Sequence, residues 1–355
     1  MRARDLGIRI GDLEPGPLNA ITDVPGTRVG HTTLIEGAAV RTGVTAVLPT
    51  PDGSPCFAGA HRLNGNGELT GLEWVRESGL LTTPVAITNT FSVGVVRDAI
   101  VAWQHERGLG AWHLPVVGET YDGRLNEIEG MHVTREHVFS ALDAASGGAV
   151  DEGCVGGGTG MICHGFKGGI GTSSRRTGLG TVGVLVQANH GRRARFAVNG
   201  VPVGRLVDTP LPGESAADAA RDGSIIVLVA TDATLLPHQC GRLAQRAALG
   251  IARLGGAGEN SSGDLILAWS TGNRIDAGAP AHDVRMVANS LLDELFYATI
   301  EATEEAILNA LLAAKTMTGR VGFTAHALDP ATLGRLLSEH APLGQVPSPN
   351  VVSKL

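Results

Sequence analysis

The sequence predicts a protein of mixed helices and strands, of the α/β or α+β class. Short runs rich in Val and Ile alternate with segments whose apolar residues recur at helical spacing. Several of these runs are apolar on both faces, which is typical of sheets that are covered on both sides. The chain has 355 residues, 43% of them apolar, so it can form one large domain or two medium ones with a sizeable core. The pattern alone does not choose a topology.

The first half of the chain is expected to contain five strands and three helices. The strands cover residues 29–31, 44–48, 85–88, 116–118 and 181–189, and the helices cover 69–77, 93–107 and 134–145. In the third helix, Val138, Leu142 and Ala145 share one face, and Thr134 is suited to cap its start. Each predicted helix therefore has an apolar side to place against a sheet.

The second half follows a clearer order. A polar stretch, 213–222, reads as an exposed linker that leads into a strand over 224–231. Pro237 suits the first turn of a helix that stops at Gly255-Gly256, and a strand over 264–270 follows. A long helical region is expected from 284 to 314, with a break near 292–298, and residues 341–355 are expected to form a surface tail. The carboxylates of this long helical region are expected on its solvent side: Glu301, Glu304 and Glu305.

Composition excludes several classes of function. The net charge of −7 argues against nucleic acid as the main partner. No apolar stretch has the length of a signal peptide or a membrane span, so we expect a cytoplasmic protein with no membrane partner. The four cysteines (Cys56, Cys154, Cys163 and Cys240) form no CxxC pair, which favours buried, reduced thiols over a zinc site.

Gly223-Ser224 is the most informative dipeptide in the chain. It joins the polar stretch to the apolar run 225–230. If the bond between the two residues were cut, Ser224 would carry a hydroxyl and a free α-amine, whose pKa of roughly 7.7–8 makes it a usable base near neutral pH. One residue would then be nucleophile and base, as in N-terminal-nucleophile hydrolases. The same pattern also fits an ordinary loop entering a strand.

Two other polar groups lie at predicted strand ends. Ser262 and Asp264 alternate in an extended segment, so their side chains point the same way and could relay a proton. Asn189 ends the apolar run that begins at Thr181, where its amide could donate to a developing oxyanion. Both features also fit ordinary turns.

The remaining motifs exclude classes of function and assign none. The glycine-rich stretch 153–171 contains neither a dinucleotide-binding nor a P-loop pattern, so its glycines are better explained by close backbone packing around a pocket. The chain has no G-x-S-x-G elbow and no H-E-x-x-H motif. In the segment 119–123, Glu119 could hold a substrate ammonium, or the segment could be a surface turn.

Taken together, segments along nearly the whole chain resemble one family, in that family's order. They are 18–31, 63–67, 88–90, 119–123, 165–173, 230–239 and 302–310. The family is that of the L-aminopeptidases/D-amidases/D-esterases, which includes the β-peptidyl aminopeptidases. The resemblance implies an α+β fold, a four-layer αββα sandwich like the N-terminal-nucleophile hydrolases but with different strand connectivity.

The resemblance also implies self-processing and assigns roles. A single domain, residues 1–355, would cut itself between Gly223 and Ser224 into chains 1–223 and 224–355, and the processed protomers would form a homotetramer. Ser224 matches the nucleophile, Ser262 and Asp264 the accessory serine and acid, Asn189 the oxyanion-hole asparagine, Glu119 the carboxylate that receives the substrate's amino group, and Tyr121 a pocket tyrosine. No metal or cofactor is implied.

The expected activity is that of a serine aminopeptidase or amidase. It would release small L-, D- or β-amino acids from peptides, amides or esters with a free amino terminus. Two residues depart from the family pattern: His190 stands where a tyrosine is expected, and Phe91 where a more polar residue is expected. The alternatives are an acyltransferase like ornithine acetyltransferase, against which a serine nucleophile argues, and an uncleaved small-molecule-binding homologue.

Overall fold

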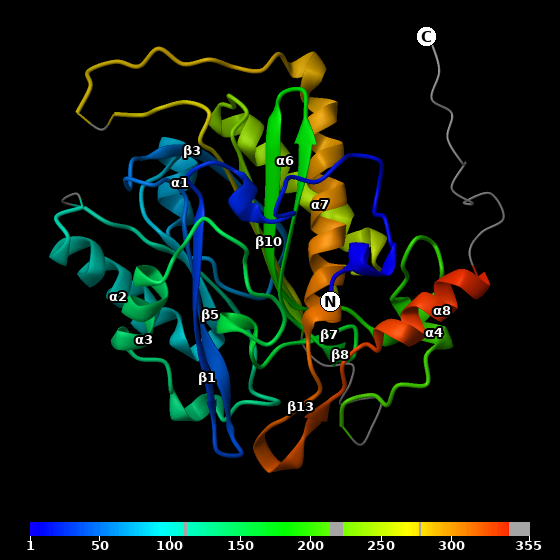
Figure 1. Cartoon of the computed structure of the whole chain (residues 1–355). Helices are drawn as coiled ribbons and strands as arrows, with labels where there is room; N and C mark the ends of the chain where they lie inside the picture. Colours follow the sequence, from blue (N-terminus) through cyan, green and yellow to red (C-terminus); the bar gives the residue numbers. More distant parts are fainter. Residues whose placement is uncertain (110–111, 214–222, 277, 341–355) are drawn as a thin grey trace, which may run out of the picture.

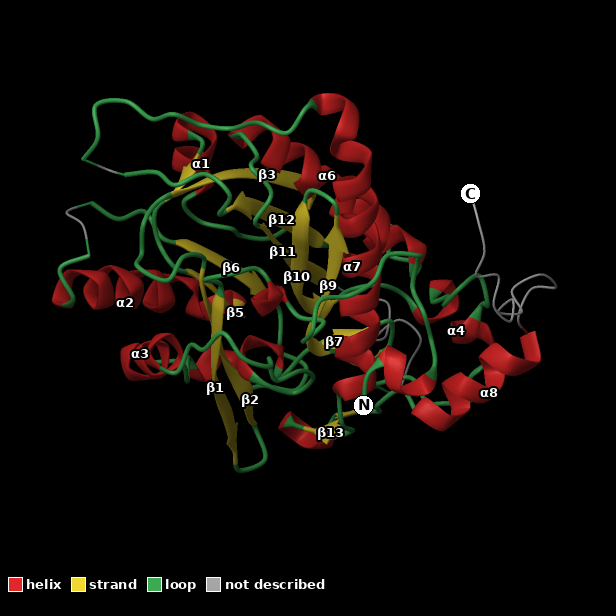
Figure 2. Cartoon of the chain, turned by 45° about the horizontal axis from the view of Figure 1, so that its top comes forward, coloured by secondary structure: helices red, strands yellow, loops and turns green. Residues whose placement is uncertain are grey.

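Two sheets lie face to face, and helices cover the outer side of each (Figures 1 and 2). The computed structural model describes residues 1–109, 112–213, 223–276 and 278–340. The expected linker falls largely, and the expected tail wholly, outside the described residues. The four layers confirm the αββα sandwich, and with it the α+β class.

The first sheet has four strands in the order β1-β2-β5-β6. They are β1 (Arg28–Glu36), β2 (Val40–Leu48), β5 (Val85–Asn89) and β6 (Val116–Thr120). β5 and β6 run parallel, and the other pairs run antiparallel. Its outer face is covered by α2 (Val93–Glu106) and α3 (Arg135–Asp143), as Figure 2 shows. Thr134 precedes α3 in an extended conformation, at the predicted cap position.

The second sheet has six strands in the order β4-β3-β12-β11-β10-β9. They are β4 (Leu80–Leu81), β3 (Cys56–Gly65), β12 (Gly263–Ser270), β11 (Ser224–Thr231), β10 (Gly180–Asn189) and β9 (Gly169–Thr177). Only β11 and β12 are parallel neighbours in this sheet, among the described residues. Its outer face is covered by α6 (Pro237–Arg253) and α7 (Leu292–Ala313).

The remaining elements are short or peripheral. They are the helices α1 (Leu72–Ser78), α4 (Val203–Leu206) and α8 (Pro330–His340), and the two-stranded ribbons β7 (Ile162–Cys163) with β8 (Phe166–Lys167) and β13 (Met317–Thr318) with β14 (Thr324–Ala325). In the described part of the chain, no helix has the length and apolar character needed to cross a membrane.

Three apolar clusters fill the three interfaces between the four layers. In β11, Ile225, Val227 and Val229 face the helices α6 and α7. The alternate residues Ile226 and Leu228 of the same strand face the other sheet. A third cluster lies between the four-stranded sheet and helices α2 and α3. Alternation places half of each central strand in each interface, which explains why these strands read as continuous apolar runs.

Apart from two-residue strands, two strands of the described chain were not predicted, and both have sequence reasons. β3 carries polar and half-buried residues, and β9 contains glycines that weaken its strand signal. A Cβ at Gly171 in β9 would lie 2.0 Å from the carbonyl oxygen of Ala306, so glycine is what allows α7 to lie close against the sheet. The glycines of this segment therefore serve helix-to-sheet packing, as well as the pocket that was expected.

The predicted long helix differs from the structure at its start and on its face. α7 begins at Leu292 and continues unbroken to Ala313, whereas residues 284–288 are not helical. The carboxylates expected in solvent are buried: Glu301, Glu304 and Glu305 are 7%, 2% and 0% exposed. The solvent-face prediction is wrong because buried or half-buried arginines neutralise these side chains.

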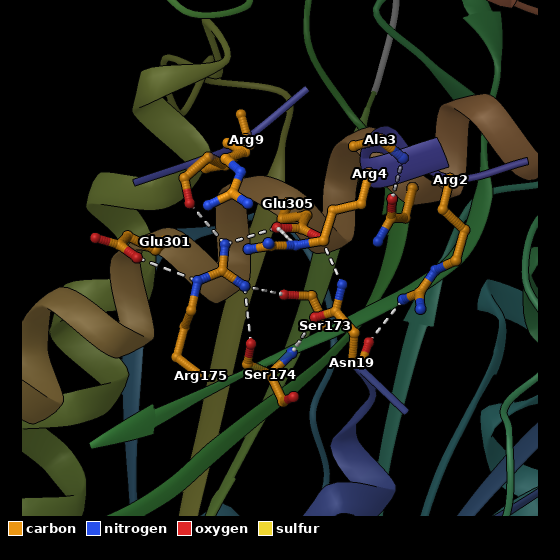
Figure 3. A network of polar contacts seen from close by, with 12 residues as sticks. Arg2, Ala3, Arg4, Arg9, Asn19, Ser173, Ser174, Arg175, Glu301 and Glu305 are labelled. Atoms are coloured by element: carbon orange, nitrogen blue, oxygen red, sulfur yellow. Dashed lines mark hydrogen bonds and ion pairs between the residues drawn. The ribbon is translucent and has the colours of Figure 1, made fainter. Parts of the chain in front are cut away.

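Arg175 on β9 forms the centre of the buried charge network (Figure 3). Its Nε donates to Glu301 Oε2 at 3.1 Å, and its Nη2 donates to Glu305 Oε2 at 2.7 Å. Arg4 and Asn19 also donate to Glu305. The network ties the N-terminal segment and β9 to α7, because each of the three supplies part of it.

Candidate active site

The end of the six-stranded sheet brings together residues that the sequence singled out. Asn189 is the last residue of β10 and pairs in register with Ser224, the first residue of β11. Across the next strand pair, Ile225 lies opposite Asp264 of β12. Strand order and register thus place the Asn189 amide, the Ser224 hydroxyl and the Asp264 carboxylate at one end of three neighbouring strands. Ser224, Asn189 and Asp264 are 7%, 4% and 1% exposed.

Ser262 and Asp264 point the same way, as their alternation predicted. The Ser262 hydroxyl donates to Asp264 Oδ1 at 2.5 Å. Between them, the backbone N–H of Gly263 donates to Ser224 Oγ at 3.0 Å. A change of register between Asp264 and Leu265, opposite β3, marks a bulge at this point. Bulges re-aim side chains at sheet ends, and this one directly follows Asp264.

Burial changes the acidity of Asp264. Loss of hydration raises the pKa of its carboxyl to about 6, against the opposing effect of the Ser262 hydrogen bond. Glu259 adds a smaller repulsion between like charges that also raises this pKa. A carboxyl with such a pKa is ionised at neutral pH and close enough to neutrality to exchange protons.

Asn189 is held at both ends of its amide. Its Oδ1 accepts from the backbone N–H of Ile162 at 2.7 Å, and its Nδ2 donates to the carbonyl of Tyr121 at 3.1 Å. These bonds fix the orientation of the amide beside Ser224. An oriented amide N–H in a buried site is suited to an oxyanion, because little reorganisation is then needed during reaction.

Glu119 lies at the end of β6, in the other sheet. It is 4% exposed, so the alternative of a surface turn does not apply to it. Oε1 accepts from the backbone N–H of Glu68 at 3.0 Å, and Oε2 accepts from the Thr90 hydroxyl. Burial raises the pKa of this carboxyl above its usual range, although both hydrogen bonds act in the opposite direction.

Gly67 connects Glu119 with the Ser224 side of the site. A Cβ on Gly67 would lie 3.0 Å from Glu119 Oε1 and 3.1 Å from the Cα of Gly263. Glu119 and Gly263 therefore lie on either side of one glycine, and Gly263 itself donates to Ser224. The two sheets bring a carboxylate and a hydroxyl close together across their shared interface.

A small cavity opens beside these groups. Its lining includes Tyr121, Asn189, His190, Gly223, Glu259 and Ser262. Gly223 is part of the lining, whereas Ser224 is not. A Cβ on Gly223 would lie 2.7 Å from the Asn189 carbonyl oxygen and 2.8 Å from the His190 Cα, so this position has no room for a side chain. Close approach to the end of β10 thus requires glycine immediately before Ser224.

Comparison with known proteins decides the family. The model of peptidase family S58 matches residues 19–325, most of the chain. The chain belongs to peptidase family S58. A curated relative, the beta-peptidyl aminopeptidase BapA of Sphingosinicella microcystinivorans, is 48% identical over 96% of this chain and 92% of its own length. Family membership makes the protein a serine-type aminopeptidase of the N-terminal-nucleophile kind.

Solved structures agree with this assignment. A beta-aminopeptidase from a Burkholderia species has 55% identity and a TM-score of 0.89, covering 96% of this chain and 99% of that one. The L-aminopeptidase D-Ala-esterase/amidase of Ochrobactrum anthropi has 43% identity and a TM-score of 0.90, covering 95% and 98%. That enzyme is described as a variant among the N-terminal-nucleophile hydrolase folds. This S58 peptidase therefore shares its fold with two aminopeptidases over almost its full length.

The two departures from the family pattern have different surroundings in this S58 peptidase. His190 is 3% exposed, and its ring lies 5.1 Å from that of His164. Burial lowers the pKa of His190 well below its usual value, so the ring is uncharged at neutral pH. Phe91 is 48% exposed and follows Thr90, the donor to Glu119. The first departure adds an imidazole behind Asn189, and the second adds an apolar surface next to the Glu119 side.

Several residues of the site carry no role in the sequence analysis. Thr90 holds Glu119, Gly67 provides the close approach, and the backbone of Gly263 holds Ser224. Thr90 and Gly67 lie within segments that resemble the family, which was the available signal. The role of Gly263 depends on its N–H alone, and a backbone donor has no side-chain signature.

Proposed function

We propose that the chain cuts itself between Gly223 and Ser224 and that the new N-terminal Ser224 is the nucleophile of the mature peptidase. The position of Ser224 carries this proposal. Ser224 lies opposite Asn189, and its Oγ accepts a hydrogen bond from Gly263, the residue between Ser262 and Asp264. Gly223 lines the cavity, so its departure after the cut would expose Ser224 to the cavity. The products are chains 1–223 and 224–355 of one folded unit.

In processing, the Ser224 hydroxyl attacks the Gly223 carbonyl carbon. The hydroxyl proton passes by way of Ser262 to the Asp264 carboxylate and then to the departing nitrogen of Ser224. The peptide C–N bond breaks as the C–O ester bond forms. Water hydrolyses this ester and releases the Gly223 carboxylate and the Ser224 hydroxyl.

In the mature enzyme, the free α-amine of Ser224 takes the proton of its own hydroxyl, with Ser262 and Asp264 completing the relay. The oxygen attacks the substrate carbonyl, and Asn189 stabilises the resulting oxyanion. The leaving amine or alcohol takes the proton, and water then cleaves the ester on Ser224. Glu119 binds the ammonium of the substrate, so one N-terminal residue is released at a time.

The proposed substrates are short peptides, amides and esters with a free amino terminus. β-Amino, D- and small L-residues are all candidates for the first position, in keeping with the relatives named above. Hydrolysis of a matched panel of p-nitroanilides, one for each class, ranks them. No metal or organic cofactor takes part in the proposed steps.

Processing is tested on the purified protein. We expect two bands on a denaturing gel, with intact masses for chains 1–223 and 224–355. N-terminal sequencing of the smaller chain should begin Ser-Ile-Ile-Val. A single intact chain with full peptidase activity would overturn the proposal, and so would a cut at any other bond.

The pH dependence of processing should show whether Asp264 accepts a proton in this step. Its raised pKa means that the carboxyl stays protonated up to about pH 6 in the uncut chain, and only the ionised form can accept a proton from Ser262. The processing rate should therefore rise with pH through about 6. Chain made by cell-free translation and shifted to different pH values provides the measurement.

Asp264→Asn and an exposed control complete this test. Asp264→Asn should process slowly at every pH and without a rise near the pKa of Asp264. Asp98→Asn, which changes an exposed carboxylate on α2, should keep the wild-type profile. An unchanged profile in Asp264→Asn would remove Asp264 from the relay.

Glu119→Gln should weaken substrate binding and leave processing intact. The carboxylate–ammonium hydrogen bond contributes roughly 1.5–3 kcal/mol, so kcat/KM should fall about 10–100-fold. Glu77→Gln is the matched control, because Glu77 is an exposed carboxylate on α1. The loss should be confined to substrates with a free amino group, so an equal loss on an analogue without that group would contradict the assigned role.

We propose a homotetramer of processed protomers located in the cytoplasm. Large apolar side chains are exposed at and near the start of α7 and on α6: Met286, Leu291 and Tyr297, with Leu249. All four cysteines are free, which suits a reducing compartment. Light scattering after gel filtration measures the number of protomers.

A further inference from the structure

We infer that Cys163, His164 and His190 form a binding site for a single transition-metal ion of the zinc type, directly behind Asn189. One possible ligand atom of each side chain lies within 4.8 Å of those of the other two. Cys163 Sγ and His190 Nδ1 are 3.7 Å apart. Among the described residues, no other group of three such side chains lies so close together.

These distances are near those of a tetrahedral site. Zinc binds thiolate sulfur at about 2.3 Å and imidazole nitrogen at about 2.0–2.1 Å, so its ligand atoms lie roughly 3.3–3.7 Å from one another. The Cys163–His190 distance already has this value. The imidazole of His164 must approach by about 1 Å, a shift that side-chain rotation can supply.

The backbone around these residues explains how neighbours in sequence converge. His164 follows Cys163 in a left-handed conformation (φ +50°), so the two side chains do not diverge as they would in a strand. The N–H of His164 donates to the carbonyl of His190 at 2.7 Å. Gly191 leaves space for the ring, because a Cβ there would lie 2.2 Å from a carbon of the His164 imidazole.

The donor atoms suit a metal better than they suit one another. His164 Nδ1 lies 3.4 Å from the carbonyl of Arg192, which favours the tautomer with the lone pair on Nε2. His164 Nε2 is buried without a hydrogen-bond partner, and His190 Nδ1 faces the Cys163 thiol. A buried polar atom without a partner is costly, so the lone pair of His164 beside the Cys163–His190 pair points to a missing ligand. Coordination would displace the Cys163 thiol proton to solvent.

The site has a route to solvent and a link to the catalytic groups. Gly165, His190 and Gly191 line the cavity, so an ion can reach the three ligands from it. Ile162 and Asn189, which share a hydrogen bond, directly precede Cys163 and His190. Drawing the two ligands together therefore moves both partners of that bond. This effect rests on the proposed oxyanion role of Asn189: because a bound ion displaces that amide, it slows hydrolysis.

The first test is spectroscopic and does not depend on activity. Purified protein treated with EDTA is titrated with Co²⁺, which gives a thiolate-to-cobalt absorption band when cysteine binds it. We expect one equivalent per protomer and displacement by Zn²⁺. Cys163→Ser should lose the band and weaken binding at least about 100-fold, because it removes the thiolate that zinc-type ions prefer. Cys154→Ser should keep it, since Cys154 lies outside the cluster.

His190→Asn provides a second variant in case Cys163→Ser does not fold. It should retain part of the thiolate band with weaker binding. No band in the wild-type protein, or an equal band in Cys163→Ser, would overturn the site. These results are independent of the proposed nucleophile, because Ser224→Ala should bind Co²⁺ like the wild type.

The second test is hydrolysis with the site filled. Zn²⁺ at the concentration that displaces Co²⁺ should lower kcat at least about tenfold, which corresponds to a modest misplacement of an oxyanion donor. EDTA should restore the rate, and Cys154→Ser should respond like the wild type. Unchanged hydrolysis with the ion bound would overturn the link to Asn189.

Discussion

Ser224→Ala is expected to leave the chain as one polypeptide of 355 residues and to lower peptidase activity by at least about 10⁴-fold. The variant has no oxygen to attack the Gly223 carbonyl, so no free α-amine forms at residue 224. Nucleophile and base are lost together, because the proposed mechanism takes both from the same residue. Intact mass and p-nitroanilide hydrolysis measure the two effects separately.

The controls for Ser224→Ala come from the neighbouring serines. Ser261 lines the cavity but is not the serine that donates to Asp264, so Ser261→Ala should process and hydrolyse like the wild type. Ser262→Ala should slow both steps and still yield some cut chain, because the nucleophile remains. Ser224→Ala leaves the Gly263 N–H without its acceptor, so its unfolding temperature should fall by only a few degrees. An active, uncut Ser224→Ala protein would require a different nucleophile.

The strand end that carries the site could be predicted from sequence because its signals are local. The alternation of Ser262 and Asp264 requires only that the segment be extended, and their 2.5 Å hydrogen bond confirms it. Asn189 and Ser224 each mark the boundary of an apolar run, so their positions at strand ends were also predictable. The register that sets them opposite each other depends on strand pairing, which a local pattern does not contain.

The contacts that cross between layers could not be predicted in the same way. Glu119 reaches the site from the other sheet because Gly67 lets it approach Gly263, and this contact joins three distant segments. In the sequence, His190 is only a departure from the family pattern. The left-handed backbone of His164, which brings the His164 ring next to His190, is not visible in the sequence. The resemblance supplied the sandwich and the role of Glu119, whereas spacing alone left both open.

The carboxylates of α7 show where helical periodicity misleads. Glu301, Glu304 and Glu305 lie at spacings that place them on one polar face, and a polar face usually meets solvent. Here that face is buried. Glu301 and Glu305 lie against β9 and the N-terminal segment and pair with Arg175 and Arg4, whereas Glu304 pairs with Arg253 of α6. Arg175, one of the two charge partners of Glu305, lies 130 positions away in sequence, beyond the range of any periodicity.

Arg175→Met is expected to cause the largest loss of stability among single changes away from the site. Arg175 is fully buried and donates to Glu301, Glu305 and the carbonyls of Ile10 and Ser174. Removing one partner of a buried ion pair costs about 3–5 kcal/mol, because the remaining carboxylates keep their desolvation penalty without its compensation. The unfolding temperature should fall by at least about 5 °C. Differential scanning fluorimetry of the processed protein measures it.

An exposed arginine distinguishes this effect from loss of charge in general. Arg335 pairs with Glu339 one helical turn away on α8, with both side chains about half exposed, and such pairs contribute roughly 0.3–0.5 kcal/mol. Arg335→Met should therefore leave the unfolding temperature nearly unchanged. Equal shifts in the two variants would mean that the buried network stabilises the fold no more than a surface pair. A large shift in Arg175→Met alone, with Ser224-dependent processing retained, would show that the network joins α7 to β9 and the N-terminal segment without forming part of the chemistry.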